Sequence, residues 1–310
     1  MTDSSLSSIP GGRAATLRSL RVREAVAGYL FVLPTLVGFL AFTVGPMLFS
    51  FGISVFEWEV LTPPRFVGLA NYGFMFRNER FLNGFRNTLL FALFVVALNV
   101  AISLLLAVAI QRRLPTLLRA YFRTAFFLPL VISTASVAIV LSFVFNREFG
   151  IANYYLGLLG VEPIPWLTSS SWAMTTVVVA TVWKSFGFDL IVFVAGLQSV
   201  PRHLYDAAAI DGANGWHQFW RITLPLLSPT VFFATVVGVI GNLQVFDQAY
   251  ILTKGGPGDA TRTVVMVIYD DAFGTLRMGY GSAIAVVLFV LIMALTLAQF
   301  GLGRRLVHYG

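Results

Sequence analysis

The chain has 310 residues, of which 57% are hydrophobic and only 11% are charged, and its mean hydropathy is +0.82. A soluble domain carries about 25% charged residues, so this composition excludes a water-soluble globular protein and indicates an integral membrane protein. The chain has no cysteine, which excludes disulfides, thiolate catalysis and cysteine-rich metal sites, and its three histidines, His203, His217 and His308, do not pair with carboxylates at metal-ligand spacing.

The N-terminal part of the chain combines a polar tail with a long apolar run. Residues 1–24 are rich in Ser, Gly and Arg, and we expect a disordered cytoplasmic tail there. The arginines followed by apolar residues resemble a signal peptide. However, the apolar run continues from residue 25 to about residue 56, and no small-x-small cleavage site follows a short core. We therefore predict a retained first span, with residues 25–310 forming the membrane domain.

The membrane domain contains six apolar segments, each long enough to cross about 30 Å of hydrocarbon at 1.5 Å per residue. They cover approximately residues 27–55, 88–110, 122–145, 173–197, 229–252 and 281–302. The predicted fold class is an all-α polytopic membrane protein with six transmembrane helices.

The distribution of charge predicts the orientation of these spans. The two ends and the loops 111–123 and 198–228 together carry twelve basic and four acidic residues, whereas the loops 56–87, 146–172 and 253–280 carry eight of each. Basic loops stay in the cytoplasm, so both termini and the loop 198–228 are predicted to be cytoplasmic. The pI near 10.0 is then a consequence of topology, and no nucleic-acid partner is needed to explain it.

The stretch from residue 201 to residue 225 differs from an ordinary connector. It contains "YDAAAIDGANGWHQFWRITLP", which begins at Tyr205. Pro201 suits a helix start, and Gly212 suits a left-handed cap that ends the first helix. Trp216, Phe219 and Trp220 then share one face of a second short helix. The pattern predicts two short helices joined by a tight glycine turn.

Two interpretations of this loop follow from its physical chemistry alone. An amphipathic pair could lie among lipid headgroups, which would suit the aromatic half. Alternatively, the small face formed by Ala207 and Ala208 could let another protein's backbone approach closely. Lipid immersion does not explain Asp206, Asp211 and Gly212 in the first half.

The same stretch closely resembles the signature loop of binding-protein-dependent ABC importer permeases, written EAA-x-x-D-G-A, then F, then I-x-L-P. Asp206 stands where that family usually has Glu, so the charge is kept on a shorter stem. "VGLANY" at 67–72 and "AYILTKGGPGDATRT" at 249–263 resemble the carbohydrate branch of the family, which includes maltose, trehalose and glycerol-3-phosphate importers. The residues that match the signature in register are Ala207, Ala208, Asp211, Gly212, Ala213, Phe219, Ile222, Leu224 and Pro225.

The resemblance implies a permease subunit of an ATP-driven importer, in which the loop 201–225 is a coupling helix that docks on a cytoplasmic ATPase. It implies a second, nonidentical permease, two ABC ATPase subunits that bind ATP and Mg²⁺, and an extracytoplasmic solute-binding protein. This chain itself would bind no cofactor and would not be an enzyme. The location implied is the bacterial or archaeal cytoplasmic (inner) membrane. The residues assigned to ATPase coupling are Asp206, Ala207, Ala208, Asp211, Gly212 and Ala213.

Polar residues inside the spans are the candidates for a solute path, because charge within a membrane is costly. Lys184 and Asp189 are five residues apart, about 140° around a helix, and are poorly placed to pair. Gln244 and Asp247, three residues apart, are expected to share a helix face. The alternative is that such residues hold helices together or bind the partner permease. The candidate path residues are Trp183, Lys184, Asp189, Asn242, Gln244 and Asp247.

Two alternative functions fit the sequence less well than import driven by ATP. A secondary transporter or channel energised by an ion gradient would not need the loop 201–225, and the sequence shows no clear inverted repeat. A membrane enzyme would need paired carboxylates, a His cluster or a Ser/His arrangement at a membrane face. The chain has no Gly-rich phosphate loop with Lys-Ser/Thr, so the energy source is expected on a separate protein.

Overall fold

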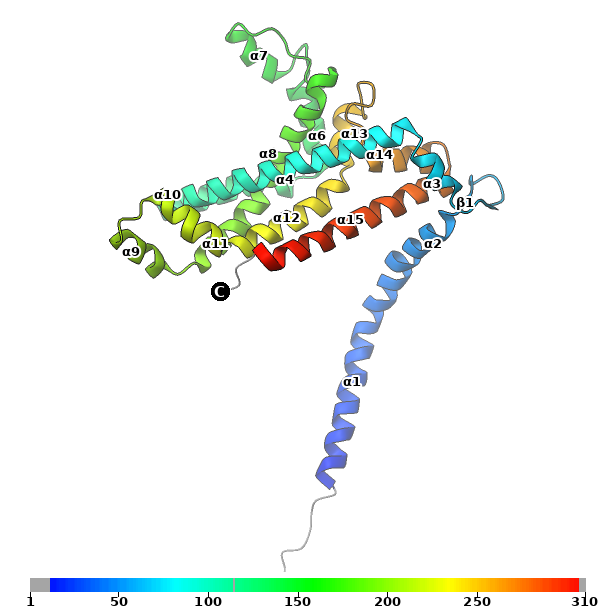
Figure 1. Cartoon of the computed structure of the whole chain (residues 1–310), viewed down its shortest axis with the longest axis horizontal. Coiled ribbons are helices and arrows are strands. Elements are labelled where there is room, and N and C mark those ends of the chain that lie inside the picture. Colours follow the sequence, from blue (N-terminus) through cyan, green and yellow to red (C-terminus); the bar gives the residue numbers. More distant parts are fainter. Residues whose placement is uncertain (1–11, 114, 307–310) are drawn as a thin grey trace, which may run out of the picture. The chain divides into compact units, whose positions relative to one another are not determined.

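The computed structural model describes the backbone of residues 12–113 and 115–306, and most of this backbone is helical (Figure 1). The chain divides into two compact units, Met1–Gly52 and Ile53–Gly310. The first unit is built on one long helical segment. The second contains the other predicted spans.

The first unit comprises helix α1 (Gly12–Phe39), the π-helix η1 (Leu40–Val44) and helix α2 (Gly45–Ile53). The expectation of disorder over residues 1–24 is therefore corrected for residues 12–24, which form the first turns of α1, while residues 1–11 lie outside the described part. The reason is that Arg, Leu and Ala are good helix formers and no proline occurs from residue 12 to residue 33. The first predicted span is confirmed as a helix over Arg23–Ile53 that is long and apolar enough to cross a membrane.

The second unit contains a short β-hairpin, which the sequence analysis did not predict, followed by the helices. In the hairpin, Phe56 pairs with Phe66 and Glu57 pairs with Arg65 in antiparallel register. The elements are β1 (Phe56–Glu57), β2 (Arg65–Phe66), α3 (Ala70–Met75), α4 (Glu79–Arg113), α5 (Thr116–Val131), α6 (Thr134–Val144), α7 (Ile151–Leu158), α8 (Ser170–Ser199), α9 (Arg202–Ile210), α10 (Gly215–Gln218), η2 (Phe219–Thr223), α11 (Leu224–Leu226), α12 (Ser228–Leu243), α13 (Asp247–Thr253), α14 (Val264–Tyr269), η3 (Asp270–Gly274) and α15 (Met278–Leu306).

Packing in the second unit is centred on α4. This helix packs against α8 and α12, while α5 covers another side of α8 and α15 packs beside α12. Figure 1 shows α4, α12 and α15 running side by side, with α9 and α10 near one end and α3 near the other. Three apolar clusters fill the interior, and the cluster nearest α9 and α10 contains Leu190, Phe193 and Leu227. The loop between α8 and α12 packs on this cluster.

The spans agree with the predicted all-α polytopic fold. Four helices are long and apolar enough to cross a membrane, and two bent helix pairs raise the number to six if each pair counts as one span. The continuous helices of the second unit are Glu79–Gln111, Ser170–Ser199 and Met278–Arg304.

Two of the predicted spans are not straight helices. The span predicted at 122–145 bends by 99° between α5 and α6, because Ile132 and Ser133 adopt extended backbone angles just after Pro129. The span predicted at 229–252 ends at Leu243, and α13 begins only at Asp247. The three residues between them are not helical.

One glycine sets how closely α5 approaches α8. A Cβ atom built on Gly187 would collide with the main-chain carbonyl oxygen of Phe126. The Phe126 and Phe186 rings lie 5.4 Å apart at the same contact. Membrane helices use small residues in this way to bring backbones together, so α5 is held directly against the half of α8 that leads into the loop.

Candidate docking loop and candidate solute path

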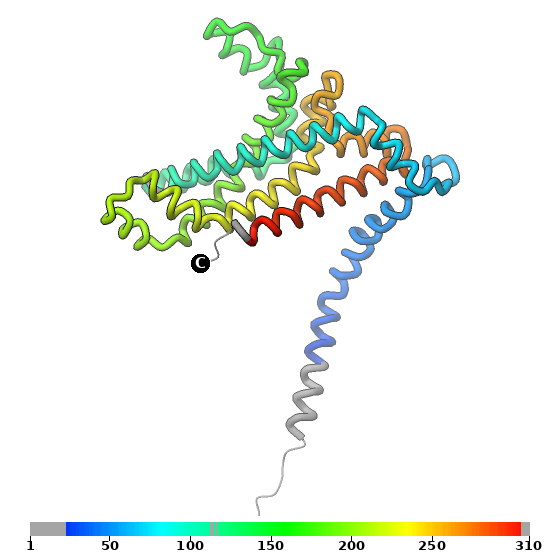
Figure 2. Tube along the Cα trace, in the orientation of Figure 1, coloured from blue at the N-terminus to red at the C-terminus, as the bar shows by residue number. Residues whose placement is uncertain are grey.

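The loop between α8 and α12 contains the two predicted short helices, and Figure 2 shows the chain reversing direction through it. Helix α9 ends in a Schellman turn. Gly212 has a φ of +81°, its N–H donates to the Ala209 carbonyl at 3.1 Å, and the Ala213 N–H donates to the Ala208 carbonyl at 2.8 Å. The left-handed glycine predicted from the sequence is thus confirmed.

The second short helix begins with a side-chain cap. The Asn214 carboxamide oxygen accepts a hydrogen bond from the His217 backbone N–H at 3.0 Å, and it also lies 2.9 Å from His217 Nδ1. This cap satisfies one of the N–H groups that a helix start leaves without a partner. Sequence reasoning missed Asn214, although Asn is among the strongest capping residues.

Contacts beneath the loop hold it in place. The Tyr205 and Thr223 hydroxyl oxygens lie 3.0 Å apart, and Thr223 is fully buried. Phe219 and Leu224 pack on the apolar cluster that contains Leu227. The two arms of the loop are therefore tied to each other and to the bundle.

The tip itself is exposed, and this is where the predicted coupling residues lie. Asp206, Ala207, Asp211 and Gly212 are exposed, and Ile210 at the tip keeps 87% of its surface accessible. A shallow groove of about 450 Å³ lies at this tip. Its lining includes four of the six predicted residues, Ala208, Asp211, Gly212 and Ala213, together with His217, Gln218, Arg221 and Ile222.

The aromatic half of the loop has one inward and two outward rings. Trp216 and Trp220 keep 68% and 49% of their surface exposed, and their rings lie 5.5 Å apart. Phe219 contacts Trp220 at 5.3 Å but packs toward the bundle. The predicted apolar face is therefore formed, with Phe219 as its anchor.

The candidate path residues lie on α8, α12 and α13, except Gln244, which follows the last residue of α12. The expectation that Gln244 and Asp247 share a helix face is wrong, because α12 ends at Leu243 and Asp247 is the first residue of α13. Phe246 between them has φ −136° and ψ −66°, which breaks the helical register. The Phe246 ring stacks on Tyr250, with ring centroids 4.9 Å apart, and it also contacts the sequence-distant Tyr269 at 5.2 Å.

Lys184 and Asp247 instead lie on two helices that pack against each other, α8 and α13, and no ion pair within 4.0 Å joins them in the described part of the chain. The Asp247 carboxylate is close enough to act electrostatically on the Lys184 ammonium group. Asp247 and the nearby Trp183 are exposed, with Trp183 at 47%. Asp189, in contrast, is only 8% exposed. Of the two charged residues on α8, Lys184 is the one that a solute could reach in company with Asp247.

The two candidate amides bond to their own helix. Asn242 donates to the Gly238 carbonyl at 2.9 Å, and Gln244 donates to the Ile240 carbonyl at 3.1 Å. Each amide group carries two N–H bonds and a carbonyl oxygen, so these contacts use only part of its capacity. Gln244 is exposed and Asn242 is half-buried.

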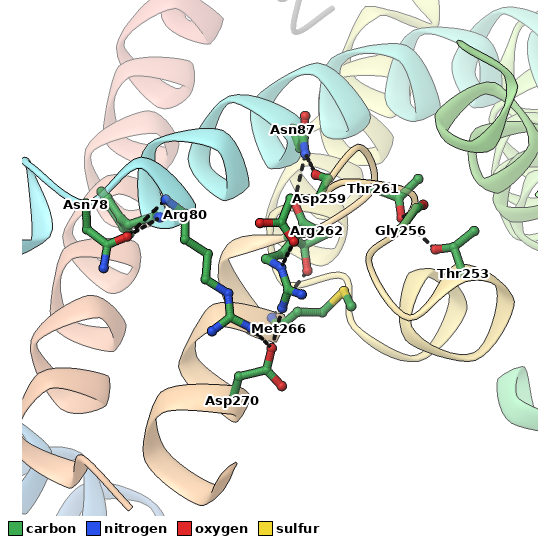
Figure 3. Close-up of polar contacts among 12 residues, drawn as sticks. Asn78, Arg80, Asn87, Thr253, Gly256, Asp259, Thr261, Arg262, Met266 and Asp270 are labelled. Carbon is green, nitrogen blue, oxygen red and sulfur yellow. Dashed lines mark hydrogen bonds and ion pairs between the residues drawn. The ribbon is translucent and has the colours of Figure 1, made fainter. Parts of the chain in front are cut away.

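Sequence reasoning missed an ion-pair cluster at the end of the bundle opposite α9, shown in Figure 3. Arg262 contacts the carboxylate of Asp259 at 2.5 Å and also pairs with Asp270, which Arg80 contacts at 2.6 Å. The Asn87 side chain, on α4, donates to the Asp259 and Arg262 carbonyls at 2.9 and 3.1 Å. The cluster fixes the segment 254–263 to α4 and η3.

Arg277 makes further contacts at the end of the bundle that contains the ion-pair cluster. The Arg277 guanidinium lies 5.2 Å from the centre of the Phe74 ring and 4.8 Å from that of Tyr280, which are cation–π distances. It also lies 3.7 Å from the Asp271 carboxylate. Burial raises the pKa of Asp271 above its usual range, and Arg277 opposes that rise.

Replacing Arg262 with Ala should destabilise this end of the bundle. Asp259 loses its partner and Asp270 keeps only Arg80, and hydrogen bonds to charged groups contribute about 1.5–3 kcal/mol. Because Asp259 and Asp270 stay 35% and 28% exposed, we expect a loss near the lower bound, about 1.5 kcal/mol. Thermal unfolding of the purified chain measures it. Arg65→Ala is the matched control, since its ion pair with Glu57 is more than half exposed; an equal loss there would contradict a special role for Arg262.

The fold and the loop together define a polytopic helical membrane protein with an exposed two-helix loop anchored to its bundle. Residues 99–308 match the family model described as "Binding-protein-dependent transport system inner membrane component". The chain belongs to this family of transport permease subunits.

Similar proteins extend the match to most of the chain. The chain is 36% identical over 280 residues to a probable ABC transporter permease protein, YurN, of Bacillus subtilis, covering 89% of this chain and 96% of that one. It is 35% identical over 286 residues to the trehalose/maltose transport system permease protein MalF of Thermococcus litoralis, covering 92% and 96%. A solved bacterial alginate ABC transporter, in complex with an alginate pentasaccharide-bound periplasmic protein, contains a chain with a TM-score of 0.84 at 25% identity, covering 94% and 98%.

Proposed function

We propose that this chain and a second, nonidentical permease form the path through which an ATP-driven importer moves a sugar or sugar-like solute across the inner membrane. The observation that carries the proposal is the Schellman turn at Gly212, which presents Ala208, Asp211 and Ala213 on an exposed groove. One of the two ABC ATPase subunits, which together hold ATP and Mg²⁺, would dock there. This chain would bind no cofactor and would hydrolyse nothing itself.

The mechanism we propose is alternating access. Closure of the ATPases on ATP moves the docked loops, and Tyr205, Thr223 and Phe219 carry that motion into α8 and α12. A loaded extracytoplasmic binding protein must favour the outward-open state, since a ligand can shift an equilibrium only by its differential affinity for the two states.

The sugar assignment is supported by the relatives and by the character of the path. The relatives include the trehalose/maltose permease and the sn-glycerol-3-phosphate transport system permease protein UgpA of Agrobacterium fabrum. The candidate path residues include one aromatic ring, Trp183, and the hydrogen-bonding groups of Lys184, Gln244 and Asp247. Such a combination suits a polyhydroxylated solute, whose hydroxyl groups both donate and accept hydrogen bonds.

The energy source is tested with membrane vesicles that contain the permease and its co-purifying subunits. We expect uptake of labelled trehalose, maltose or glycerol 3-phosphate to require ATP on the loop side and the binding protein on the other side. Uptake driven by an ion gradient without ATP would instead support a secondary transporter or channel.

Orientation is tested with reporters. Both termini and the α8–α12 loop are proposed to be cytoplasmic, because the loops on that side carry twelve basic and four acidic residues. A reporter active only in the cytoplasm should be active when fused at Gly310 and silent when inserted at Gly160. The reverse result would contradict the proposed orientation. It would not bear on the proposal that ATP drives uptake.

A further inference from the structure

Two hollows meet where α4 ends, α5 begins and α8 ends, and Gln198 lines both of them. The larger, of about 500 Å³, includes Arg119 and Arg202. The smaller, of about 300 Å³, includes Arg123. Arg119 and Arg123 are one turn apart on α5, so both guanidinium groups face the same corner of the bundle.

The sequence around this corner is strongly basic. The sequence has no acidic residue from position 80 to position 147, while residues 112–123 contain four arginines. Neither hollow is lined by a carboxylate. In the part of the chain that the structure describes, Arg123 and Arg202 form no ion pair.

One buried donor at this corner has no hydrogen-bond partner among the described residues. Arg123 donates from Nη2 to the Gln111 side-chain oxygen at 3.1 Å. The buried donor is its Nε–H. A buried donor without a partner is destabilising, and an oxyanion beside the guanidinium would satisfy it.

The smaller hollow is polar at one end and apolar at the other. Arg123, Thr124 and Gln198 lie at the end near the docking loop, and Phe127, Ile191 and Val194 continue one turn or more into the bundle on α5 and α8. A free phosphate would use only the polar end. A phospholipid would use both, with its phosphate at the arginines and an acyl chain along the apolar residues.

We propose that this groove binds one acidic phospholipid of the leaflet on the docking-loop side, its phosphate held by Arg123 and Arg119 and an acyl chain lying against Phe127, Ile191 and Val194. Basic pockets between membrane helices on the cytoplasmic side are suited to such headgroups. The site adjoins Tyr205 and Gln218 of the docking loop, which line the larger hollow. Only the naming of that leaflet as cytoplasmic rests on the proposed orientation.

The test measures phospholipid that stays bound to the full-length permease, purified with its co-purifying subunits and exchanged into mild detergent. Native mass spectrometry with added phosphatidylglycerol, and with phosphatidylcholine of the same chains, gives the affinity for each lipid. We expect one tightly bound phosphatidylglycerol and about fivefold weaker binding for each arginine replaced, hence about 25-fold for Arg119→Gln with Arg123→Gln. Arg123→Lys should retain most of the affinity.

The controls separate this site from general charge and from structural damage. Arg86→Gln removes the same charge from an exposed position at the other end of α4 and should leave lipid binding unchanged. Ile191→Asp keeps the arginines but makes the apolar half polar, and it should weaken phosphatidylglycerol binding as well. Equal binding of the two lipids, or retention of phosphatidylglycerol by the double variant, would overturn the proposal. If millimolar inorganic phosphate displaced the lipid, the lipid proposal would also be overturned, and the groove would instead be a site for small anions.

Discussion

Replacing Gly212 with Val should reduce binding-protein-stimulated ATP hydrolysis and solute uptake together, by at least about 5- to 30-fold. Gly212 sits at φ +81°, and a residue with a Cβ atom loses about 1–2 kcal/mol in that left-handed region. That loss corresponds to the fold-change given, because about 1.4 kcal/mol is a factor of ten in a binding equilibrium. A β-branched side chain would also intrude on a partner that approaches the groove.

The chain offers a matched control for backbone strain. Gly160 follows α7 with φ +78°, and its turn has the same two hydrogen bonds, from the Gly160 N–H to Gly157 at 3.0 Å and from the Val161 N–H to Leu156 at 3.1 Å. A Cβ atom on either glycine meets nothing within 4 Å inside the chain. Gly160→Val should therefore bear the same strain and leave ATPase coupling intact.

The measurement is association of the purified permease with its ATPase subunits, followed by stimulated hydrolysis. Asp206→Ala should weaken docking less than Gly212→Val, since it removes one exposed charge and leaves the turn unstrained. All variants should insert normally, because none alters a span. Normal association and normal ATP turnover in Gly212→Val would contradict ATPase docking on this loop. They would favour the interpretation in which the loop lies among lipid headgroups. Equal loss in Gly160→Val would assign the effect to folding.

Local signals in the sequence were sufficient for the docking loop. Gly212 follows a run of helix formers and precedes a capping Asn, so its left-handed turn depends on neighbours within a few residues. The four long spans were predictable for the same kind of reason, because length and apolar composition are local properties. The groove is formed by residues close in sequence, and half of its lining lay within the predicted set.

The arrangement of the solute-path residues and of the ion-pair cluster could not be predicted from local sequence. Both depend on contacts between residues distant in sequence. Asp270 pairs with Arg80, 190 residues away, and no local pattern connects them. The break between Gln244 and Asp247 follows from how Phe246 packs on Tyr250 and Tyr269, which periodicity cannot anticipate. Asp247 acts electrostatically on Lys184 because α8 and α13 pack together, and spacing along one helix could not predict this.

The helix break also sharpens the prediction for the solute path. Asp247 is exposed at the first turn of α13 beside Lys184, and Gln244 is exposed at the end of α12. Alanine at either position should change the affinity or selectivity of uptake by about 5- to 150-fold, the equivalent of roughly 1–3 kcal/mol for a lost buried polar contact with solute. Association with the ATPase subunits should stay unchanged, since the docking loop is not altered.

A double-mutant cycle then separates solute binding from a purely structural Lys184–Asp247 pair. Lys184→Gln, Asp247→Asn and the double variant are compared in uptake and in thermal stability, with Asn83→Ala on the exposed face of α4 as the polar-to-alanine control. If both residues contact solute, the uptake affinity should fall in each single variant while the melting temperature stays close to that of the parent. If the pair only holds α13 to α8, stability should fall in each single variant and recover in the double, and unchanged uptake curves would remove both residues from the path.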